Sequence, residues 1–492
     1  MSSLVVQNPW WMGSKRIESD RHIVDFNNNP IKWDPRIRHF LDLNSKAIYT
    51  LRGPRQVGKT TLVKLMIRRL LGEGVSPRRI FYYTCDLIEG PTKLVSIIEE
   101  YLGYSERFSD STRFIFLDEI SAVRDWQKGI KYLSDLGRFS NATVLMTGSH
   151  NLDIRKAAER LPGRRGRSEK SVDKILLPMK FAEYIESRDE ELGSLLRDLG
   201  LLRFDARKKM IEDLEKGIIP PTVKDINLYF NKLSQYFEEY LLTGGIVRAI
   251  NDYFTHGFIT EETYTTYVQV TIGDILRWNK REIYLSQLIR RINESLCSQV
   301  SWRSLQKNTD IGSQNTVAEY VDVLKESFVL SPFYVLDRSK DGPNYGSNKK
   351  IHFHDPFIFH ALRGWIRQSP YYEGALEFIR SNEKTKLVEC IIGDHLVRFA
   401  FSLNPIDTFE PTSHVMYWKD KRNEVDFVLK YGDDYMPFEV KYSSSFSRRD
   451  INGVYNFTKG GSNYKGIIVT KDLLDVTNGV VAVPAPVLLT LF

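Results

Sequence analysis

The chain has 492 residues, of which 42% are hydrophobic and 27% are charged. This composition is typical of globular proteins and excludes a mainly disordered chain. The length predicts roughly three or four domains. Lys and Arg number 69 against 62 Asp and Glu, so the net charge is +7. A mild basic excess permits nucleic-acid binding but does not require it.

The three cysteines, Cys85, Cys297 and Cys390, lie far apart in the sequence. This spacing excludes a disulfide framework and a CxxC zinc module, and it suits a reducing compartment. No apolar run reaches the roughly 20 residues that span a bilayer, and the N-terminus lacks the apolar core of a secretory signal. We therefore expect a cytoplasmic protein without a membrane partner.

Strand-like and helix-like patterns alternate along the first 178 residues. The expected strands are 47–51, 80–84, 114–117, 143–147 and 174–177. The expected helices are 61–71, 92–102 and 126–137. Alternation of this kind predicts a parallel sheet with helices on both faces.

A phosphate-binding motif, GPRQVGKT, joins the first expected strand to the first expected helix. Its two glycines let the backbone N–H groups curl toward phosphate oxygens, and the helix N-terminus adds partial positive charge. Lys59 is expected to reach the β- and γ-phosphates, and the Thr60 hydroxyl to coordinate Mg²⁺. The residues expected to bind ATP are Gly53, Pro54, Arg55, Gln56, Val57, Gly58, Lys59, Thr60 and Thr61.

Two acidic residues follow the buried strand expected at 114–117. The C-terminal end of a parallel strand is where ligands bind, so Asp118 is expected to hold Mg²⁺ and Glu119 to act as general base. The pair favours ATP hydrolysis over binding alone. A polar residue at the end of the next strand could orient the water, and of Thr147 and Ser149 we favour Ser149. The alternative is an ordinary turn.

Basic residues dominate 155–170, with seven Lys and Arg against two acids. Arg164 and Arg165 lie on a glycine-flanked loop, from which they could reach a γ-phosphate in their own subunit or in a neighbour. The second arrangement would require a homo-oligomer. A solvated basic loop and a contact to nucleic-acid phosphates are the alternatives.

The pattern changes after Pro178. Residues 179–256 read as mostly helical, and 257–345 as short helices followed by a strand at 328–336. A loop is expected at 339–348, and boundaries are placed near 178, 256 and 348. Strands return at 350–354, 415–418, 425–430, 437–442 and 466–470.

Five stretches together resemble a known group of proteins. They are GPRQVGKTT (53–61), FLDEIS (116–121), LMTGS (145–149), LPGRRG (161–166) and LPMKFAEY (177–184). Further matches lie at 242–245, 316–329 and 424–441. The chain resembles prokaryotic, especially archaeal, AAA-like ATPases whose C-terminal half ends in a nuclease-like domain. This resemblance implies ATP hydrolysis on an AAA-type parallel-sheet core, at 1–178, followed by a helical lid at 179–256.

A basic segment and a helix–hairpin outline characterise 257–348. Seven Lys and Arg stand against two acids in 277–307, and a capped helix precedes the strand expected at 328–336. This outline, with which the resemblance agrees, is that of a winged helix, so DNA is the expected partner. The alternative is a helical interaction module that binds no nucleic acid. No arginine lies within 316–324, which argues against strong base readout.

The remaining domain, 349–492, carries a set of acidic residues. If two expected strands pair, Asp426, Glu439 and Lys441 converge, and the two carboxylates could hold Mg²⁺ or Mn²⁺ while the lysine positions water. The set resembles the D…ExK arrangement of the PD-(D/E)XK nucleases, in which an upstream helical acid, here Glu389, completes the site. A fold that keeps these acids as a binding scaffold is the alternative.

His352, His354 and His360 lie near Asp355 and could form a metal cluster, but the alternation of His352 and His354 favours a half-solvated strand. Two functions remain open. The first is an ATP-dependent protein that cuts or grips DNA. The second is a regulatory ATPase switch whose nuclease-like domain binds a protein partner.

Overall fold

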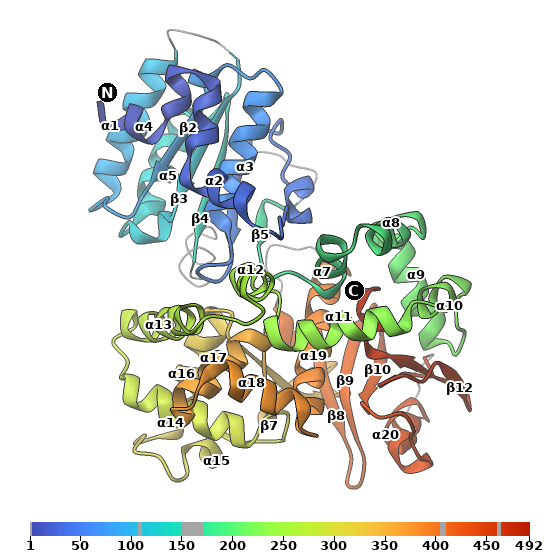
Figure 1. The fold of residues 1–492 in the computed structure, drawn as a ribbon. Coiled ribbons are helices and arrows are strands. Elements are labelled where there is room, and N and C mark those ends of the chain that lie inside the picture. The colour runs from blue at the N-terminus through green and yellow to red at the C-terminus, as the bar shows by residue number, and fades with distance from the viewer. Residues whose placement is uncertain (1, 107–110, 150–170, 404–409, 460–463) are drawn as a thin grey trace. The chain divides into compact units, whose positions relative to one another are not determined.

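The computed structural model describes residues 2–106, 111–149, 171–403, 410–459 and 464–492 (Figure 1). The chain divides into two compact units, Met1–Leu177 and Pro178–Phe492. None of the helices in these ranges is long and apolar enough to cross a membrane.

The first unit contains the parallel sheet that the alternating pattern predicts. Its strands are β1 (Ile48–Arg52), β2 (Ile80–Thr84), β3 (Arg113–Asp118), β4 (Ala142–Gly148) and β5 (Asp173–Ile175). All pairs are parallel, and the strand order is β2-β3-β4-β1-β5. Every residue of β1, β3 and β4 is buried, which explains their apolar runs.

Helices cover both faces of this sheet (Figure 1). They include α3 (Lys59–Gly72), α4 (Pro91–Ser105) and α5 (Trp126–Asp135). Each begins within two residues of its expected start, because Gly58, Pro91 and Trp126 mark the starts in the sequence. The prediction of a parallel sheet between helices is therefore confirmed.

The N-terminal segment belongs to the core of the first unit, although no element was expected there. It contains α1 (Ser2–Gln7), short 3₁₀ turns and α2 (Arg21–Asn28). Trp10 and Trp11 are buried, and the Asn8 side chain bonds both the N–H and the carbonyl of Tyr82 on β2. Asn8 thus satisfies the backbone of an edge strand.

The second unit is built on a mixed sheet of eight strands, in the order β12-β13-β11-β10-β9-β8-β6-β7. The strands are β6 (Leu330–Asp337), β7 (Gly342–Phe353), β8 (Val415–Lys419), β9 (Glu424–Tyr431), β10 (Asp434–Val440), β11 (Ile467–Thr470), β12 (Asp475–Thr477) and β13 (Val480–Pro484). Neighbours β10, β11 and β13 run parallel, whereas β8, β9 and β10 alternate in direction.

Helices make up the rest of the second unit. They are α7 (Phe181–Arg188), α8 (Glu190–Asp198), α9 (Phe204–Glu215), α10 (Pro221–Asn227), α11 (Phe230–Thr243), α12 (Val247–His256), α13 (Glu261–Arg277), α14 (Glu282–Glu294), α15 (Trp302–Gln306), α16 (Gln314–Glu326), α17 (Pro356–Arg367), α18 (Tyr371–Arg380), α19 (Lys384–Leu403), α20 (Arg448–Lys459) and α21 (Ala485–Leu489). The region expected to be mostly helical, 179–256, holds α7 to α12.

The hairpin β6–β7 is the edge of the eight-stranded sheet rather than a separate small hairpin. Residue 348, where a boundary was expected, lies inside β7. The loop expected at 339–348 is present only as the turn at 338–341 and is wrong from Gly342 onward, where β7 begins. Glycine and proline are tolerated there since β7 is the terminal strand of the sheet.

The expectation of a half-solvated strand at His352 and His354 is also wrong. His352 is 1% exposed, because α19 packs on β7 and the rings of Phe333 and Phe427 lie beside the imidazole. His354 bonds Ser331 and Asp394 and is nearly buried. Both faces of the end of β7 are covered by protein.

Candidate functional site

The loop between β1 and α3, residues 53–58, has a backbone that only glycine permits at two points. A Cβ atom on Gly53 would collide with the carbonyl oxygen of Leu176. Gly58 has φ 105° and ψ 20°, in the left-handed region that other residues rarely adopt. The loop then leads directly into α3, whose N-terminal N–H groups are available to an anion.

Lys59 lies in the centre of this loop and is 4% exposed. Its Nζ donates to the carbonyl oxygens of Gly53 and Pro54, each at 2.9 Å, and lies 3.8 Å from Oε1 of Glu119. The ammonium is therefore held over the loop by groups that a phosphate could replace. Gln56, Val57 and Thr61 belong to the same loop and first helical turn, and Gln56 has φ 61°.

Thr60 and Asp118 meet at the C-terminal edge of the sheet. The Thr60 hydroxyl donates to Oδ2 of Asp118 at 2.8 Å, and Asp118 is 3% exposed. A hydroxyl and a carboxylate oxygen side by side are hard donors of the kind that Mg²⁺ prefers. The residues present therefore fit the expected cation.

Thr147 rather than Ser149 contacts both acidic residues. Its hydroxyl donates to Oδ1 of Asp118 at 2.5 Å and accepts from the N–H of Glu119 at 2.9 Å. This follows from the strand order, because β4 lies between β1 and β3. Glu119 has φ 51° at the end of β3, so the backbone turns immediately after Asp118. Ser149 lies 3.4 Å from Nε of Arg55.

Contacts that begin at Asp20 in the N-terminal segment lead through Lys64 and Tyr82 to Asp118. Asp20 forms an ion pair with Lys64 at 3.1 Å, and the Lys64 ammonium lies 3.4 Å from the centre of the Tyr82 ring. The Tyr82 hydroxyl donates to Oδ2 of Asp118 at 3.0 Å. Burial lowers the pKa of Lys64, which makes its pairing with Asp20 necessary. No local sequence motif indicates these contacts.

Arg164 and Arg165, the expected contacts to a γ-phosphate, lie outside the described residues. The site of the first unit therefore consists of the phosphate loop, the Thr60–Asp118 pair, Glu119 and Thr147.

A second cluster of charged groups, called here the acid cluster, lies in the second unit. Asp426 on β9 and Glu439 on β10 face each other: the Asp426 N–H donates to Oε2 of Glu439 at 3.2 Å. Oδ2 of Asp426 accepts from the N–H of Val440 at 2.9 Å, and Lys441 Nζ lies 2.8 Å from Oε1 of Glu439. The structure thus brings together three of the residues that the D…ExK pattern singled out.

Lys350 on β7, which the sequence analysis did not consider, occupies the middle of the acid cluster. Its Nζ lies 2.7 Å from Asp426 Oδ1, 3.3 Å from Glu389 Oε1 and 2.5 Å from Glu424 Oε1. Lys350 is 2% exposed. Burial disfavours its charge, but the three carboxylates outweigh burial and hold its pKa well above the ordinary value.

The acid cluster does not fit a divalent cation while Lys350 stays in place. The inner oxygens of Asp426 and Glu389 already face the ammonium, and a metal ion there would meet like charge at short range. No cleavage step is therefore derived for this cluster.

Stability of the second unit should depend on pH through Glu389 and Glu439. Burial, followed by the charge of Asp426, raises the pKa of each to about 8 from 4.5. A group with a raised pKa binds its proton more tightly when folded, so its contribution to stability is full below 4.5 and is lost as pH rises through about 8. The pKa of Asp426 is lowered, so its own effect on stability falls at a lower pH than this range.

We therefore expect the free energy of unfolding to fall between about pH 5 and pH 8. Glu389→Gln and Glu439→Gln should each flatten that slope, and the exposed Glu377→Gln should not. Urea unfolding at several pH values measures how the free energy of unfolding changes with pH in the wild type and in each variant. Equal slopes in all three variants would contradict the assignment.

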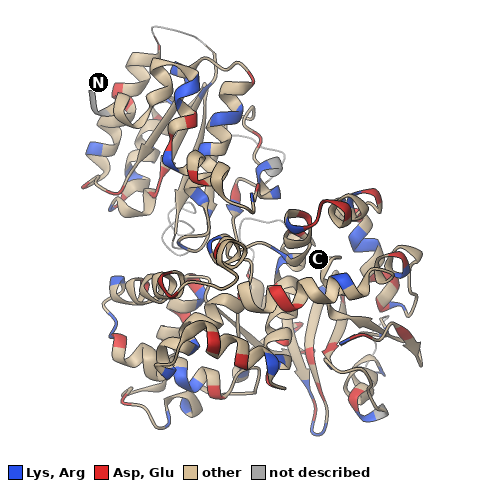
Figure 2. Cartoon of the chain, in the orientation of Figure 1, with Lys and Arg blue, Asp and Glu red and all other residues tan. Residues whose placement is uncertain are grey.

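The basic segment 277–307 covers the end of α13, α14 and α15. Figure 2 shows basic and acidic residues interspersed over these helices. Exposed cations are Arg277, Arg281, Arg290, Arg303 and Lys307. Lys280 and Arg291 are less exposed and form ion pairs with Glu319 and Glu294. The apolar side chains of Leu276, Trp278 and Ile283 are exposed nearby, so this surface offers both charge and apolar area.

Three family models match parts of the chain. An AAA domain model matches residues 45–185, and two domains of unknown function match 234–369 and 384–488. Among curated proteins, none matches the sequence.

Several solved structures are similar at low sequence identity. A Walker-type ATPase of Pyrococcus abyssi is 14% identical, with 71% of this chain and 95% of that chain covered and a TM-score of 0.37. The Orc1 protein of Aeropyrum pernix, solved in complex with DNA, is 11% identical, with coverages of 74% and 97% and a TM-score of 0.30. RuvB of Thermotoga maritima is 13% identical, with coverages of 65% and 89% and a TM-score of 0.25.

TM-scores this low carry no argument about function. The matched AAA model, the parallel sheet and the phosphate loop agree with one another. Residues 45–185 match the AAA domain model and contain the phosphate loop and the parallel sheet expected of such a P-loop domain.

Proposed function

We propose that this chain is a Mg²⁺-dependent ATP hydrolase that acts on nucleic acid. The observation that carries hydrolysis is the arrangement around Asp118, where Thr60 donates at 2.8 Å and Thr147 links the carboxylate to the Glu119 backbone. A domain that only bound nucleotide would not need a second acidic residue, whose carboxylate here lies 3.8 Å from the Lys59 ammonium.

Each residue of the site has a role that follows from its position. The Lys59 ammonium would exchange two carbonyl partners for β- and γ-phosphate oxygens and neutralise charge that develops on them. Thr60 and Asp118 would hold Mg²⁺, which supplies Lewis-acid stabilisation of the phosphate charge when bound. Glu119 would accept the proton of the attacking water, with Thr147 fixing its backbone.

Hydrolysis should require the metal and respond to nucleic acid. We expect phosphate release from ATP with Mg²⁺, loss of that release with a chelator, and recovery when Mg²⁺ is restored in excess. Single-stranded, duplex and branched DNA should raise the rate. Unchanged hydrolysis in the chelator would contradict the role of Thr60 and Asp118, and absence of any DNA effect would contradict the coupling.

For nucleic-acid binding, we propose the exposed cations of α14 and α15 as the contact surface. Arg303 and Lys307 lie about one helical turn apart on and after α15, and both are exposed. Cations on such a surface release counterions when they meet phosphates, so binding should weaken with salt.

The double variant with Arg303→Glu and Lys307→Glu should bind DNA of any sequence more weakly. The slope of log affinity against log salt concentration should fall in magnitude by about one for each cation removed. Fluorescence anisotropy with labelled duplex DNA at several salt concentrations measures both. Arg380→Glu, an exposed change on α18 of the same unit, should leave both unchanged. Equal effects of the two changes would exclude this surface.

The acid cluster supports a second candidate: a regulatory ATPase whose nuclease-like domain is a scaffold for a protein partner. Lys350 favours a scaffold, because it neutralises the acids that a nuclease would offer to a metal. On either proposal the second unit holds rather than cuts, so labelled DNA with Mg²⁺ or Mn²⁺ should remain intact. Cleavage that is lost in Asp426→Asn would overturn this conclusion. Recovery of a protein partner without any DNA affinity would favour the switch.

A further inference from the structure

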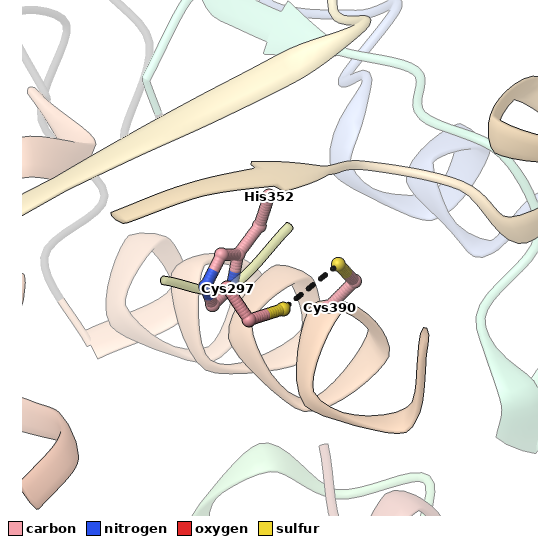
Figure 3. A group of neighbouring side chains, drawn as sticks. All are labelled: Cys297, His352 and Cys390. Atoms are coloured by element: carbon pink, nitrogen blue, oxygen red, sulfur yellow. Dashed lines mark hydrogen bonds between the residues drawn. The ribbon is translucent and has the colours of Figure 1, made fainter. Parts of the chain in front are cut away.

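Three side chains far apart in the sequence meet in the interior of the second unit. Cys297 follows α14, His352 lies on β7 and Cys390 lies on α19; Figure 3 shows the three together. One donor atom from each lies within 4.8 Å of the others, and the two Sγ atoms are 3.6 Å apart. All three residues are buried, at 7%, 1% and 2% exposure.

The polar atoms of this group are poorly satisfied by the protein. Neither ring nitrogen of His352 has a hydrogen-bond partner, although the ring is fully enclosed. Cys297 Sγ contacts the carbonyl of Lys386 at 3.2 Å as well as Cys390. Buried polar atoms are normally paired, so two free nitrogens beside two thiols indicate a missing partner.

The surroundings of His352 favour a ligand on one nitrogen and a carboxylate on the other. Nε2 lies 3.5 Å from Oε1 of Glu389. Nδ1 packs against Gly393 of α19, where a Cβ atom would lie 3.1 Å from it and 2.8 Å from the Phe427 ring, so glycine is what lets the imidazole approach this helix. Metal-binding histidines commonly pair their second nitrogen with a carboxylate in this way.

We propose that Cys297, His352 and Cys390 bind a single Zn²⁺ ion. Two sulfurs and one imidazole are donors that this cation prefers, and two thiolates cancel its charge in an apolar interior. Binding releases the two thiol protons to solvent, and no electron transfer is involved. The ion would link three parts of the second unit: the segment that follows α14, the strand β7 and the helix α19. The group belongs to the second unit, whereas the phosphate loop belongs to the first. Oε1 of Glu389 lies 3.3 Å from Lys350 Nζ and 3.5 Å from His352 Nε2, so Glu389 borders both the acid cluster and this group.

The metal content of the full-length protein tests this proposal. Protein produced with added Zn²⁺ and then passed through a weak chelator should retain about one equivalent per chain. Cys390→Ser and His352→Gln should each retain about a tenth of that amount or less. Cys85→Ser, which removes the buried cysteine of the first unit, should retain the full equivalent. Metal is counted by mass spectrometry of the acid-digested protein.

Two further measurements keep the result interpretable if a variant folds poorly. Cd²⁺ added to metal-free wild-type protein should produce thiolate-to-metal absorption in the ultraviolet. The Cys85→Ser variant should show the same absorption as the wild type. Zn²⁺ should also raise the melting temperature of metal-free wild type but not that of Cys390→Ser. Equal metal content in all variants, no thiolate absorption, or a Cys297–Cys390 disulfide in protein isolated under reducing conditions would each overturn the proposal.

Discussion

Lys59→Ala should lower the rate of ATP hydrolysis by at least about 100-fold, the loss typical when one preorganised charge is removed from a transition state. The ammonium is buried and is held by the carbonyls of Gly53 and Pro54 inside the phosphate loop. Its removal takes away the cation that the loop holds at the expected place of the β- and γ-phosphates. Phosphate release at saturating ATP and Mg²⁺ measures the effect.

The control for this prediction is Lys93→Ala, which removes an exposed lysine from α4 of the same unit. It should leave hydrolysis and ATP affinity unchanged. Circular dichroism and gel filtration establish that the Lys59 variant remains folded. An unchanged hydrolysis rate in folded Lys59→Ala would refute the assignment of residues 53–60 as the nucleotide loop.

Lys350→Met should destabilise the second unit by about 3–5 kcal/mol, the usual result of removing one partner of a buried charge group. The methionine matches the length of the lysine stem but leaves Glu389, Glu424 and Asp426 without their shared cation. The loss should be smaller at pH 5 than at pH 8, because protonated carboxyls no longer repel one another. Urea unfolding at the two pH values measures the difference.

The neighbouring residue provides a matched control. Lys349 is also on β7 and is 3% exposed, but its ammonium lies 4.0 Å from the centre of the Trp302 ring rather than among carboxylates. Lys349→Met should therefore cost far less and show little change with pH. Adding Asp426→Asn to Lys350→Met should recover part of the stability. Equal losses for Lys349→Met and Lys350→Met would show that burial, not charge pairing, is what Lys350 contributes.

The parallel sheet and the phosphate loop could be predicted because their signals are local. Buried strands give apolar runs, and Gly53 and Gly58 stand where the backbone requires glycine. The convergence of Asp426, Glu439 and Lys441 could also be predicted, since antiparallel strands joined by a short turn must pair. In each case the residues that matter are close in sequence.

The missed residues depend on contacts between distant segments. Thr147 rather than Ser149 meets the acidic pair because Thr147 lies inside β4, next to the end of β3, whereas Ser149 follows the strand and lies 3.4 Å from Nε of Arg55. Lys350 lies in a strand that was expected, 350–354, but its contacts with Glu389, Glu424 and Asp426 join segments that are 39 to 76 residues apart. Cys297 and Cys390 appeared unrelated because 93 residues separate them.

The most direct test of the central claim is the behaviour of Glu119→Gln. The amide keeps the shape of the side chain but cannot accept the proton of the attacking water. We expect this variant to bind ATP with wild-type affinity in the presence of Mg²⁺ and to hydrolyse it at least about 100-fold more slowly. Hydrolysis at the wild-type rate would contradict the account, because the carboxylate after β3 would then have no part in the reaction.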